Sequence, residues 1–475
     1  MAKLEPEFLG IDRAPLNRRS FLHATTSALV ACSLPPRVQT RSTPSRPRPS
    51  PSQLAWQRDE LALFLHFGVN TFTDREWGDG RENPSIFSPS ALDARQWTRA
   101  ARNAGARALI LTAKHHDGFC LWPTRTTGHS IAASPWRAGQ GDVVREFVEA
   151  CRTEGLGAGL YLSPWDRNNP AYGDSPKYND LYCDQLTELL TRYGPIAEVW
   201  FDGANGEGPN GKRQIYDWPR FFGLVRQLQP NAVMFSDAGP DVRWCGNEKG
   251  TAGDPNWSTM NPDAVPFPGA DGSGIIDALQ HGDPAGTVWR PAEVDVSIRP
   301  GWFYHPAEDG RVRTVDNLES LYFSSVGRNG KLLLNVPPTR DGLLHSTDVL
   351  NLAKFRFLLT SLFDRDVTRD ARRTSLVIGP GRAEVELDLG RPVTFAVARL
   401  EEDITRGQSV ARYTLYGARD RDWRVISQGS TIGYAKLDRF EPVTVQRVRL
   451  AIEDAVGMPQ DIIVKLYNPF GPVAI

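Results

Sequence analysis

One acidic side chain follows a strongly apolar run in the middle of the chain. Residues 196–204 are apolar and β-branched until Asp202, which Gly203 follows. This pattern predicts a buried parallel strand whose carboxyl end presents one carboxylate. In α/β barrels and open α/β sheets, catalytic groups lie at the carboxyl ends of the strands. With Trp200 beside it, Asp202 is a candidate nucleophile directed at a sugar face; the alternative is an acid that caps the next helix.

Other polar side chains end neighbouring apolar runs. His66 ends the first run, His115 and His116 follow the second, and Asp237 ends a later one. Three histidines at the carboxyl ends of two strands face one axis of a barrel, which favours a functional site over a structural role. They could ligate a metal as in amidohydrolase barrels, although such barrels usually begin with an H-x-H strand, and here the first run carries one histidine. Neutral imidazoles that hydrogen-bond sugar hydroxyls fit equally well.

Strands and helices alternate along most of the chain. Apolar runs predict strands at residues 61–68, 106–112, 156–162, 196–202, 232–237, 293–298 and 331–336. Helical spacing occurs at residues 90–104, 143–154, 182–193 and 218–228. This repetition predicts an α/β fold, a (β/α)8-like (TIM-type) barrel over residues 54–365. The Gly- and Pro-rich stretch 239–291 is long for a loop, and long loops in compact domains are usually functional.

The pattern changes after the barrel. Residues 366–475 contain short alternating segments separated by turns, with no helical period. This pattern predicts a C-terminal all-β sandwich of roughly one hundred residues.

The composition limits the function classes. Hydrophobic residues make up 40% and charged residues 23% of 475, which is typical of a globular enzyme rather than a disordered chain. Lys and Arg number 55 against 56 Asp and Glu, so no overall basic field exists to attract nucleic acid. The 13 tryptophans favour carbohydrate, because indole faces stack on sugars, although many tryptophans simply fill cores.

The first residues read as a targeting segment. Arg18 and Arg19 form a twin-arginine pattern, and residues 23–31 are apolar but too short to span a membrane. Residues 29–32 resemble a lipobox with Cys32 as the lipidated residue; the alternative is a plain cleavable signal with an incidental cysteine. Residues 33–53 are rich in Pro, Ser and Arg and predict an extended linker outside the fold. We therefore expect twin-arginine export to the periplasm, as a periplasmic protein or as a membrane-anchored lipoprotein.

Four cysteines follow Cys32, namely Cys120, Cys151, Cys183 and Cys245. None forms a C-x-x-C pair, so no zinc site is expected. Their even number in an exported protein permits disulfides, whereas folding in the reducing cytoplasm before export argues against them. We interpret Cys245 first as a small packing residue.

Five motifs in order resemble the α-L-fucosidases of glycoside hydrolase family 29. They are Leu65-His66-Phe67-Gly68, Glu76-Trp77, Lys114-His115-His116-Asp117-Gly118-Phe119, Trp200-Phe201-Asp202-Gly203 and Leu332-Leu333-Leu334-Asn335-Val336. The similarity covers residues 54–363 and is weaker through the sandwich. Two further stretches, residues 240–248 and 296–304, resemble the subgroup that removes α-1,3- and α-1,4-linked branch fucose.

The resemblance implies a retaining exo-α-L-fucosidase with two carboxyl groups. Asp202 matches the family nucleophile, and Glu248 matches the acid/base of the subgroup. Retention needs carboxyls about 5–5.5 Å apart, with their pKa values pushed in opposite directions. From the residues alone, Glu248 would be a solvated loop glutamate competing with Asp237, Asp254 and Glu293.

The resemblance also implies how fucose is held. The expected sugar-binding residues are His66, Glu76, Trp77, His115, His116, Tyr161 and Trp200, while Trp302 either stacks on the sugar or packs in the barrel wall. The substrate would be a fucosylated oligosaccharide or glycoprotein glycan, and no metal or organic cofactor is implied. The alternatives are a metal-dependent barrel hydrolase using the three histidines and a non-catalytic carbohydrate-binding barrel.

Overall fold

The computed structural model describes residues 46–459 and 461–469 of the chain. The predicted twin-arginine pair, Arg18 and Arg19, and the predicted lipidation residue Cys32 lie outside the described residues. None of the helices in the described ranges is both long and apolar enough to cross a membrane.

Folded structure begins earlier than the sequence predicts. Helix α1 (Pro51–Arg58) starts within the expected linker, and Ser50 and Gln53 form a capping box at its first turn. The Gln53 side chain is buried and donates hydrogen bonds to the carbonyls of Asp241 (2.6 Å) and Trp289 (2.8 Å). The prediction of an unstructured linker as far as residue 53 is therefore wrong at its end, because these last residues form a capped helix that packs on the barrel.

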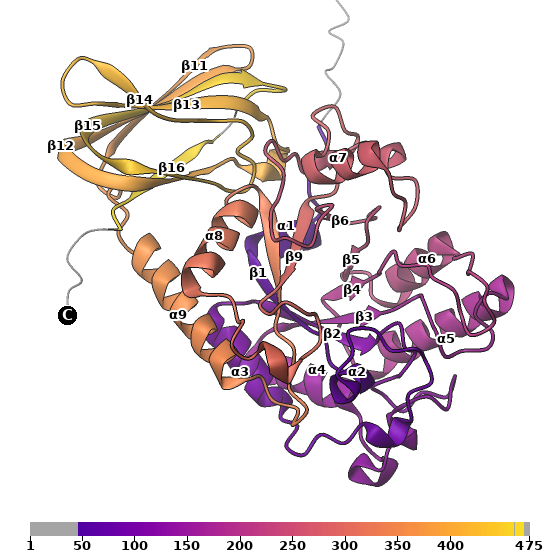
Figure 1. The fold of residues 1–475 in the computed structure, drawn as a ribbon. Helices are drawn as coiled ribbons and strands as arrows, with labels where there is room; N and C mark the ends of the chain where they lie inside the picture. The colour runs from indigo at the N-terminus through magenta and orange to yellow at the C-terminus, as the bar shows by residue number, and fades with distance from the viewer. Residues whose placement is uncertain (1–45, 460, 470–475) are drawn as a thin grey trace, which may run out of the picture. The chain divides into compact units, whose positions relative to one another are not determined.

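Eight parallel strands form the barrel, in the hydrogen-bonded order β5-β4-β3-β2-β1-β10-β9-β6 (Figure 1). A parallel bridge between Phe235 and Val242 joins β5 to the chain just before β6, so the barrel is nearly closed. The strands are almost entirely buried, which is why they read as continuous apolar runs. They are β1 (Leu61–Leu65), β2 (Ala108–Lys114), β3 (Gly157–Leu162), β4 (Glu198–Trp200), β5 (Val233–Phe235), β6 (Arg243–Trp244), β9 (Ala292–Ser297) and β10 (Gly330–Asn335).

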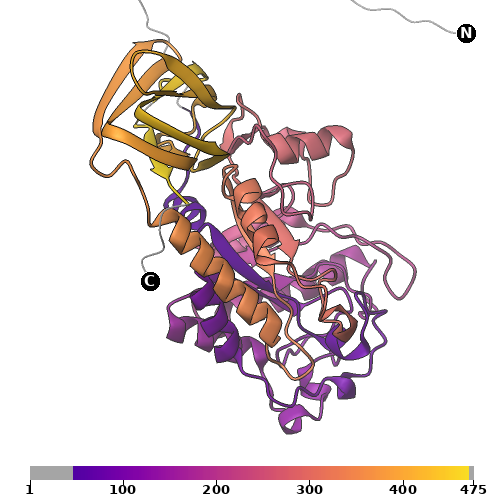
Figure 2. The ribbon, with the colours of Figure 1, turned by 60° about the vertical axis from the view of Figure 1, so that its left-hand side comes forward.

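Helices cover the outside of the barrel. They are α3 (Ala94–Ala104), α4 (Val143–Glu154), α5 (Ser175–Arg192), α6 (Trp218–Leu228), α8 (Val315–Ser325) and α9 (Ser346–Phe363). Asp93 and Asp142 cap the first turns of α3 and α4, and glycines with positive φ, Gly105 and Gly155, end them. The long helix α9 packs against α3 and α8 (Figure 2). The bounds predicted for α4 and α6 are confirmed, whereas α5 begins at Ser175 rather than at residue 182 because Pro176 starts its first turn.

The connections between strands also hold short elements. Helix α2 (Val69–Thr73) follows β1, and the stretch predicted as one long loop, residues 239–291, contains β6, β7 (Thr259–Met260), α7 (Ser273–His281) and β8 (Val288–Trp289). This stretch is therefore not one continuous loop. Its glycines and prolines separate short elements, and its two-residue strands are too short to show a periodic pattern.

The predicted sandwich is an antiparallel sheet in the order β11-β12-β15-β13-β14, with β16 also paired to β12 (Figure 1). Strands β12 and β15 each contain 20 residues, and their pairing shifts register along its length. The first part of β12 also pairs with β11, and its last part pairs with β16. The inward side chains form their own core around Leu387, Leu415 and Leu450. The strands are β11 (Arg372–Gly379), β12 (Arg382–Glu401), β13 (Val410–Ala418), β14 (Trp423–Gly429), β15 (Lys436–Ala455) and β16 (Ile463–Tyr467).

The four cysteines of the described ranges, Cys120, Cys151, Cys183 and Cys245, are buried and free. Cys245 packs with Ala252, Ala292 and Val294, as expected for a small packing residue.

Candidate active site

Asp202 lies just beyond the carboxyl end of β4 and is held at both oxygens. The Tyr161 hydroxyl donates to Oδ2 at 2.9 Å, and the Ala204 amide donates to Oδ1 at 2.7 Å. Burial, and then the neighbouring Asp202, raises the pKa of Tyr161 well above its usual range, so the phenol stays protonated as a donor. The Asp202 side chain remains 25% exposed. It is thus a carboxylate oriented by fixed donors and still accessible to a substrate.

The three predicted histidines line the same end of the barrel. His66 and His115 meet edge to face with ring centroids 5.6 Å apart, and His115 and His116 are 4.1 Å apart. The Nε2 atom of His116 lies 3.8 Å from Asp202 Oδ2. The sequence-based expectation that these side chains converge with Asp202 is confirmed.

Burial keeps the histidines neutral. It lowers the pKa of His66 to about 3, and burial together with the neighbouring histidines holds the pKa of His115 well below its usual range. Burial also lowers the pKa of His116, and the opposing effect of Asp202 is smaller. A neutral imidazole offers one donor and one acceptor, as sugar hydroxyls require. Within residues 46–459 and 461–469, Nδ1 of His115 is buried without a hydrogen-bond partner.

The second ring nitrogen of two histidines is already used. Nδ1 of His116 lies 2.7 Å from the hydroxyl of Ser163, and Nδ1 of His66 lies 2.8 Å from Oδ1 of Asn335. In the part of the chain that the structure describes, no three His, Cys, Asp or Glu side chains are arranged to hold a metal ion. The geometry therefore favours histidines oriented for hydrogen bonding.

Asn335 connects two parts of the site and was not singled out from the sequence. Its Nδ2 donates to the Ser297 hydroxyl at 2.9 Å and to the Trp302 carbonyl at 2.8 Å. Its oxygen therefore faces His66, so that Nδ1 of His66 carries the proton and Nε2 is left as an acceptor. Its signals in the sequence are its place in the motif of residues 332–336 and at the end of an apolar run, which is the carboxyl end of β10.

Aromatic side chains form one wall of the site. Trp77 is 57% exposed, and its ring meets His116 and Trp165 edge to face, each at 5.9 Å. Trp165 also lies against His116 at 4.8 Å, a contact that the sequence did not predict. An exposed indole beside polar rings offers a stacking surface for a sugar face.

Trp200, expected to hold the sugar, is mostly a packing residue. It stacks on Phe235 at 3.9 Å and lies beside Tyr161 at 5.4 Å. Its indole nitrogen donates to Glu293 at 3.0 Å inside the barrel. Its side chain is therefore buried in the barrel beside Tyr161.

Glu76, also expected to contact the sugar, binds the backbone of a neighbouring loop. Its Oε1 accepts from the Trp302 amide at 2.5 Å, and its Oε2 accepts from the Phe303 amide at 3.3 Å and lies 3.0 Å from Nε2 of His305. This carboxylate therefore anchors the loop 301–305, which follows β9.

That loop brings Trp302 to Glu248. The Trp302 indole nitrogen donates to Oε2 of Glu248 at 3.3 Å, on the exposed rim of the site. Partial burial raises the pKa of Glu248, and the charges of Asp202 and Glu76 raise it further, while the hydrogen bond from Trp302 opposes them. Glu248 is thus a carboxyl with a raised pKa that is electrostatically coupled to Asp202.

The competing acids lie elsewhere or are already bonded. Asp254 pairs with Lys436 at 2.6 Å, and Glu293 is enclosed in the barrel interior against Trp200. Asp237 accepts from the Gly269 amide at 2.8 Å, and burial, with Asp202 nearby, raises its pKa to about 7. Of these three, Asp237 alone is close to Asp202.

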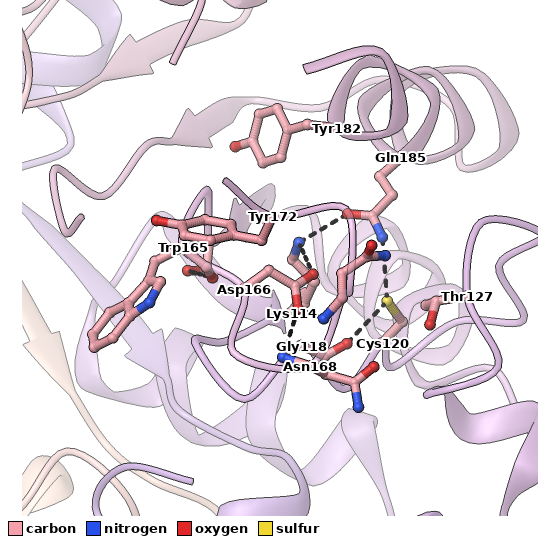
Figure 3. Close-up of polar contacts among 12 residues, drawn as sticks. Lys114, Gly118, Cys120, Thr127, Trp165, Asp166, Asn168, Tyr172, Tyr182 and Gln185 are labelled. Carbon is pink, nitrogen blue, oxygen red and sulfur yellow. Dashed lines mark hydrogen bonds and ion pairs between the residues drawn. The ribbon is translucent and has the colours of Figure 1, made fainter. Parts of the chain in front are cut away.

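Lys114 and Asp166 form a buried ion pair next to the two histidines of the second strand end (Figure 3). Nζ of Lys114 lies 3.1 Å from Asp166, 2.9 Å from Gln185 and 3.2 Å from the Tyr178 hydroxyl. Lys114 directly precedes His115, and Asp166 accepts from two backbone amides of the loop that carries Trp165. The pair therefore fixes two active-site segments against each other.

Comparison with known proteins identifies the family. The family model described as Alpha-L-fucosidase matches residues 71–356. The chain belongs to the α-L-fucosidases of glycoside hydrolase family 29. The enzyme is 43% identical over 441 residues to α-L-fucosidase 1 of Arabidopsis thaliana, covering 87% of this chain and 86% of that protein.

Two solved structures support the same assignment. A glycoside hydrolase 29 family member from an unknown rumen bacterium is 39% identical, with a TM-score of 0.83 over 91% of this chain and 79% of that one. A family 29 fucosidase from Ruminococcus gnavus, solved in complex with fucose, is 29% identical, with a TM-score of 0.81 over 90% and 96% of the two chains. The enzyme is an α-L-fucosidase, and its substrates are fucosylated glycans.

Proposed function

We propose that the enzyme is a retaining exo-α-L-fucosidase that removes α-1,3- and α-1,4-linked branch fucose. Asp202 attacks the anomeric carbon of fucose and forms a covalent glycosyl-enzyme, while the bond from that carbon to the aglycone oxygen breaks. Glu248 gives its proton to that oxygen and then takes a proton from the water that hydrolyses the intermediate. Neutral His66, His115 and His116 hydrogen-bond the hydroxyls of fucose, and Trp77 covers one face of the sugar.

The observation that carries this assignment is the contrast between the two carboxyls. Asp202 accepts hydrogen bonds from a phenol and a backbone amide, which fix the orientation of its carboxyl group. Glu248 lies at the rim, where burial and the charge of Asp202 raise its pKa. An acid must carry a proton, which the raised pKa of Glu248 favours, and a nucleophile must be oriented and accessible, which the two donors and the partial exposure give Asp202.

The linkage preference is supported by the two loops that carry Glu248 and Trp302. They meet through the Trp302–Glu248 hydrogen bond at the rim, beyond the enclosed histidines. A sugar attached to the fucose would contact this rim, and its binding energy would be used in the transition state. We expect branched Lewis a and Lewis x oligosaccharides to be better substrates than aryl fucosides, and linear α-1,2-fucosides to be hardly cleaved.

One set of variants tests the mechanism. Asp202→Ala should lose several powers of ten in turnover, and azide should restore activity with a fucosyl azide product. Glu248→Gln should lose far more activity on an oligosaccharide than on an activated aryl fucoside, because a good leaving group needs no proton. Asp237→Asn is the matched control, since it also neutralises a carboxyl beside Asp202. An Asp237 variant with the stronger leaving-group dependence would transfer the acid role to Asp237.

Substrate choice tests the linkage separately. The measurement is kcat/KM on α-1,2-, α-1,3-, α-1,4- and α-1,6-fucosylated oligosaccharides and on an aryl fucoside. A higher value on the aryl fucoside than on every branched oligosaccharide would contradict the α-1,3/1,4 preference and leave the fucosidase activity standing.

We also propose that the enzyme is exported by the twin-arginine route and is then periplasmic or anchored by a lipid at Cys32. The support is the pairing of Arg18 and Arg19 with a short apolar run and a lipobox-like ending at Cys32.

A further inference from the structure

His305 lies between two carboxylates. Its Nδ1 is 2.9 Å from Oδ1 of Asp74, and its Nε2 is 3.0 Å from Oε2 of Glu76. A neutral imidazole has one N–H and one lone pair, so it can donate to only one of these carboxylates and turns a lone pair toward the other. The imidazolium donates to both. The geometry therefore requires the proton for both bonds to exist together.

The Glu76 side of this arrangement is closely packed against the loop 301–305. A methyl group at Gly301 would lie 2.8 Å from Oε2 of Glu76 and 2.9 Å from Cδ2 of His305, so a larger residue there would have to displace one of these side chains. The same carboxylate accepts from the Trp302 and Phe303 amides. Moving Glu76 would therefore move the backbone that carries Trp302.

Trp302 connects the loop 301–305 to Glu248. Its indole nitrogen donates to Glu248, and its carbonyl accepts from Asn335, which also holds His66. A continuous set of contacts thus runs from Asp74 through His305, Glu76 and Trp302 to Glu248.

We propose that protonated His305 is a positioning residue that holds the loop 301–305 against residues 74–76 and thereby orients Glu248 for proton transfer. Loss of the His305 proton breaks one of its two bonds and loosens the loop. The enzyme then loses activity on substrates whose leaving group needs protonation. This last step rests on the proposed role of Glu248, whereas the protonation of His305 does not.

The charges around His305 determine how its protonation changes with pH. Burial by itself lowers the pKa of His305, but the bonds to Glu76 and Asp74 and the nearby Glu308 raise it above its usual 6.5. A cation also faces Asp74, because Nη2 of Arg340 lies 3.8 Å from Oδ1, the oxygen that His305 contacts. Because the folded-state pKa is raised, the contribution is complete below pH 6.5 and is lost as the pH rises through the raised value.

The test compares His305→Gln with His281→Gln. Glutamine cannot donate to carboxylates on opposite sides and does not titrate. His281, on α7, contacts the Pro255 carbonyl at 2.7 Å and lies 3.7 Å from Asp277. It is therefore also a histidine beside a carboxylate, but it is not one of the residues that connect Asp74 to Glu248. We expect His305→Gln to lower kcat/KM on a branched oligosaccharide about tenfold, which corresponds to the loss of one charge-assisted hydrogen bond. The loss on an activated aryl fucoside should be smaller. The His281 variant should match the wild type on both substrates.

Histidine-labelled NMR measures the proton directly. We expect His305 to titrate above 6.5 in the wild type and at a lower pH in Asp74→Asn, which removes one acceptor at an exposed position and also serves if His305→Gln fails to fold. A His305 that titrates at or below 6.5, or a His305→Gln enzyme with wild-type kcat/KM on the oligosaccharide, would overturn the proposal. If Glu248→Gln shows equal losses on both substrates, the acid assignment fails, and the NMR titration still decides whether His305 is a protonated bridge.

Discussion

Replacing Asn335 by aspartate exchanges an NH2 group for an oxygen at a fully buried position without changing the shape of the side chain. Asn335 donates two hydrogen bonds, to the Trp302 carbonyl and to the Ser297 hydroxyl. Aspartate cannot donate when it is ionised. The carbonyl of Trp302 then faces an oxygen, and the serine must give up its bond to the Gly301 carbonyl to satisfy the new carboxylate.

The magnitude follows from these two bonds. A buried polar group left without its partner costs about 1–3 kcal/mol, so the variant should lose roughly 2–6 kcal/mol of folding free energy. If about 1–3 kcal/mol of this appears as misplacement of Trp302 in the transition state, kcat/KM falls about 5- to 150-fold. The new carboxylate also faces Nδ1 of His66, so we expect the pKa of His66 to rise from about 3.

The assay combines thermal unfolding with kcat/KM on a branched oligosaccharide. Asn351→Asp is the matched control, because Asn351 lies in α9 and donates one hydrogen bond, to the Arg313 carbonyl at 3.0 Å. It should lose about 1 kcal/mol of stability and keep its activity. An Asn335→Asp enzyme with wild-type stability and wild-type kcat/KM would refute the view that Asn335 bridges His66 and the Trp302 loop.

Three further predictions concern other parts of the protein. Lys114→Met should reduce the free energy of unfolding by about 3–5 kcal/mol because it leaves Asp166 buried without its cation, and adding Asp166→Asn should recover part of the loss; denaturant unfolding measures both, and additive losses would contradict the coupling. Trp302→Phe removes a hydrogen bond that favours ionised Glu248, so the alkaline limb of kcat/KM attributable to Glu248 should move to higher pH, and an unmoved limb would mean that this bond does not affect the acid. Replacing Arg18 and Arg19 together by lysine should leave precursor in the cytoplasm, and normal delivery to the envelope in a fractionation experiment would contradict twin-arginine export.

Local patterns in the sequence were sufficient for the barrel and for the carboxyl-end residues. Strands buried on both faces read as continuous apolar runs, and capped helices with glycine at their ends read clearly, as in α4. Since all barrel strands are parallel, their carboxyl ends must meet at one end, and this rule alone placed His66, His115, His116 and Asp202 together. The strands of residues 239–291 escaped prediction because two-residue strands carry no period.

The tertiary structure decided which groups these side chains contact. Glu76 binds the backbone of Trp302, 226 positions away, and Asn335 contacts His66, 269 positions away. Trp200 turns its N–H toward Glu293 inside the barrel instead of toward the site. A residue type shows what a side chain can donate or accept, but the partner depends on how the barrel closes and how each loop crosses its end. Those paths depend on contacts between distant segments, and no local pattern of residues records them.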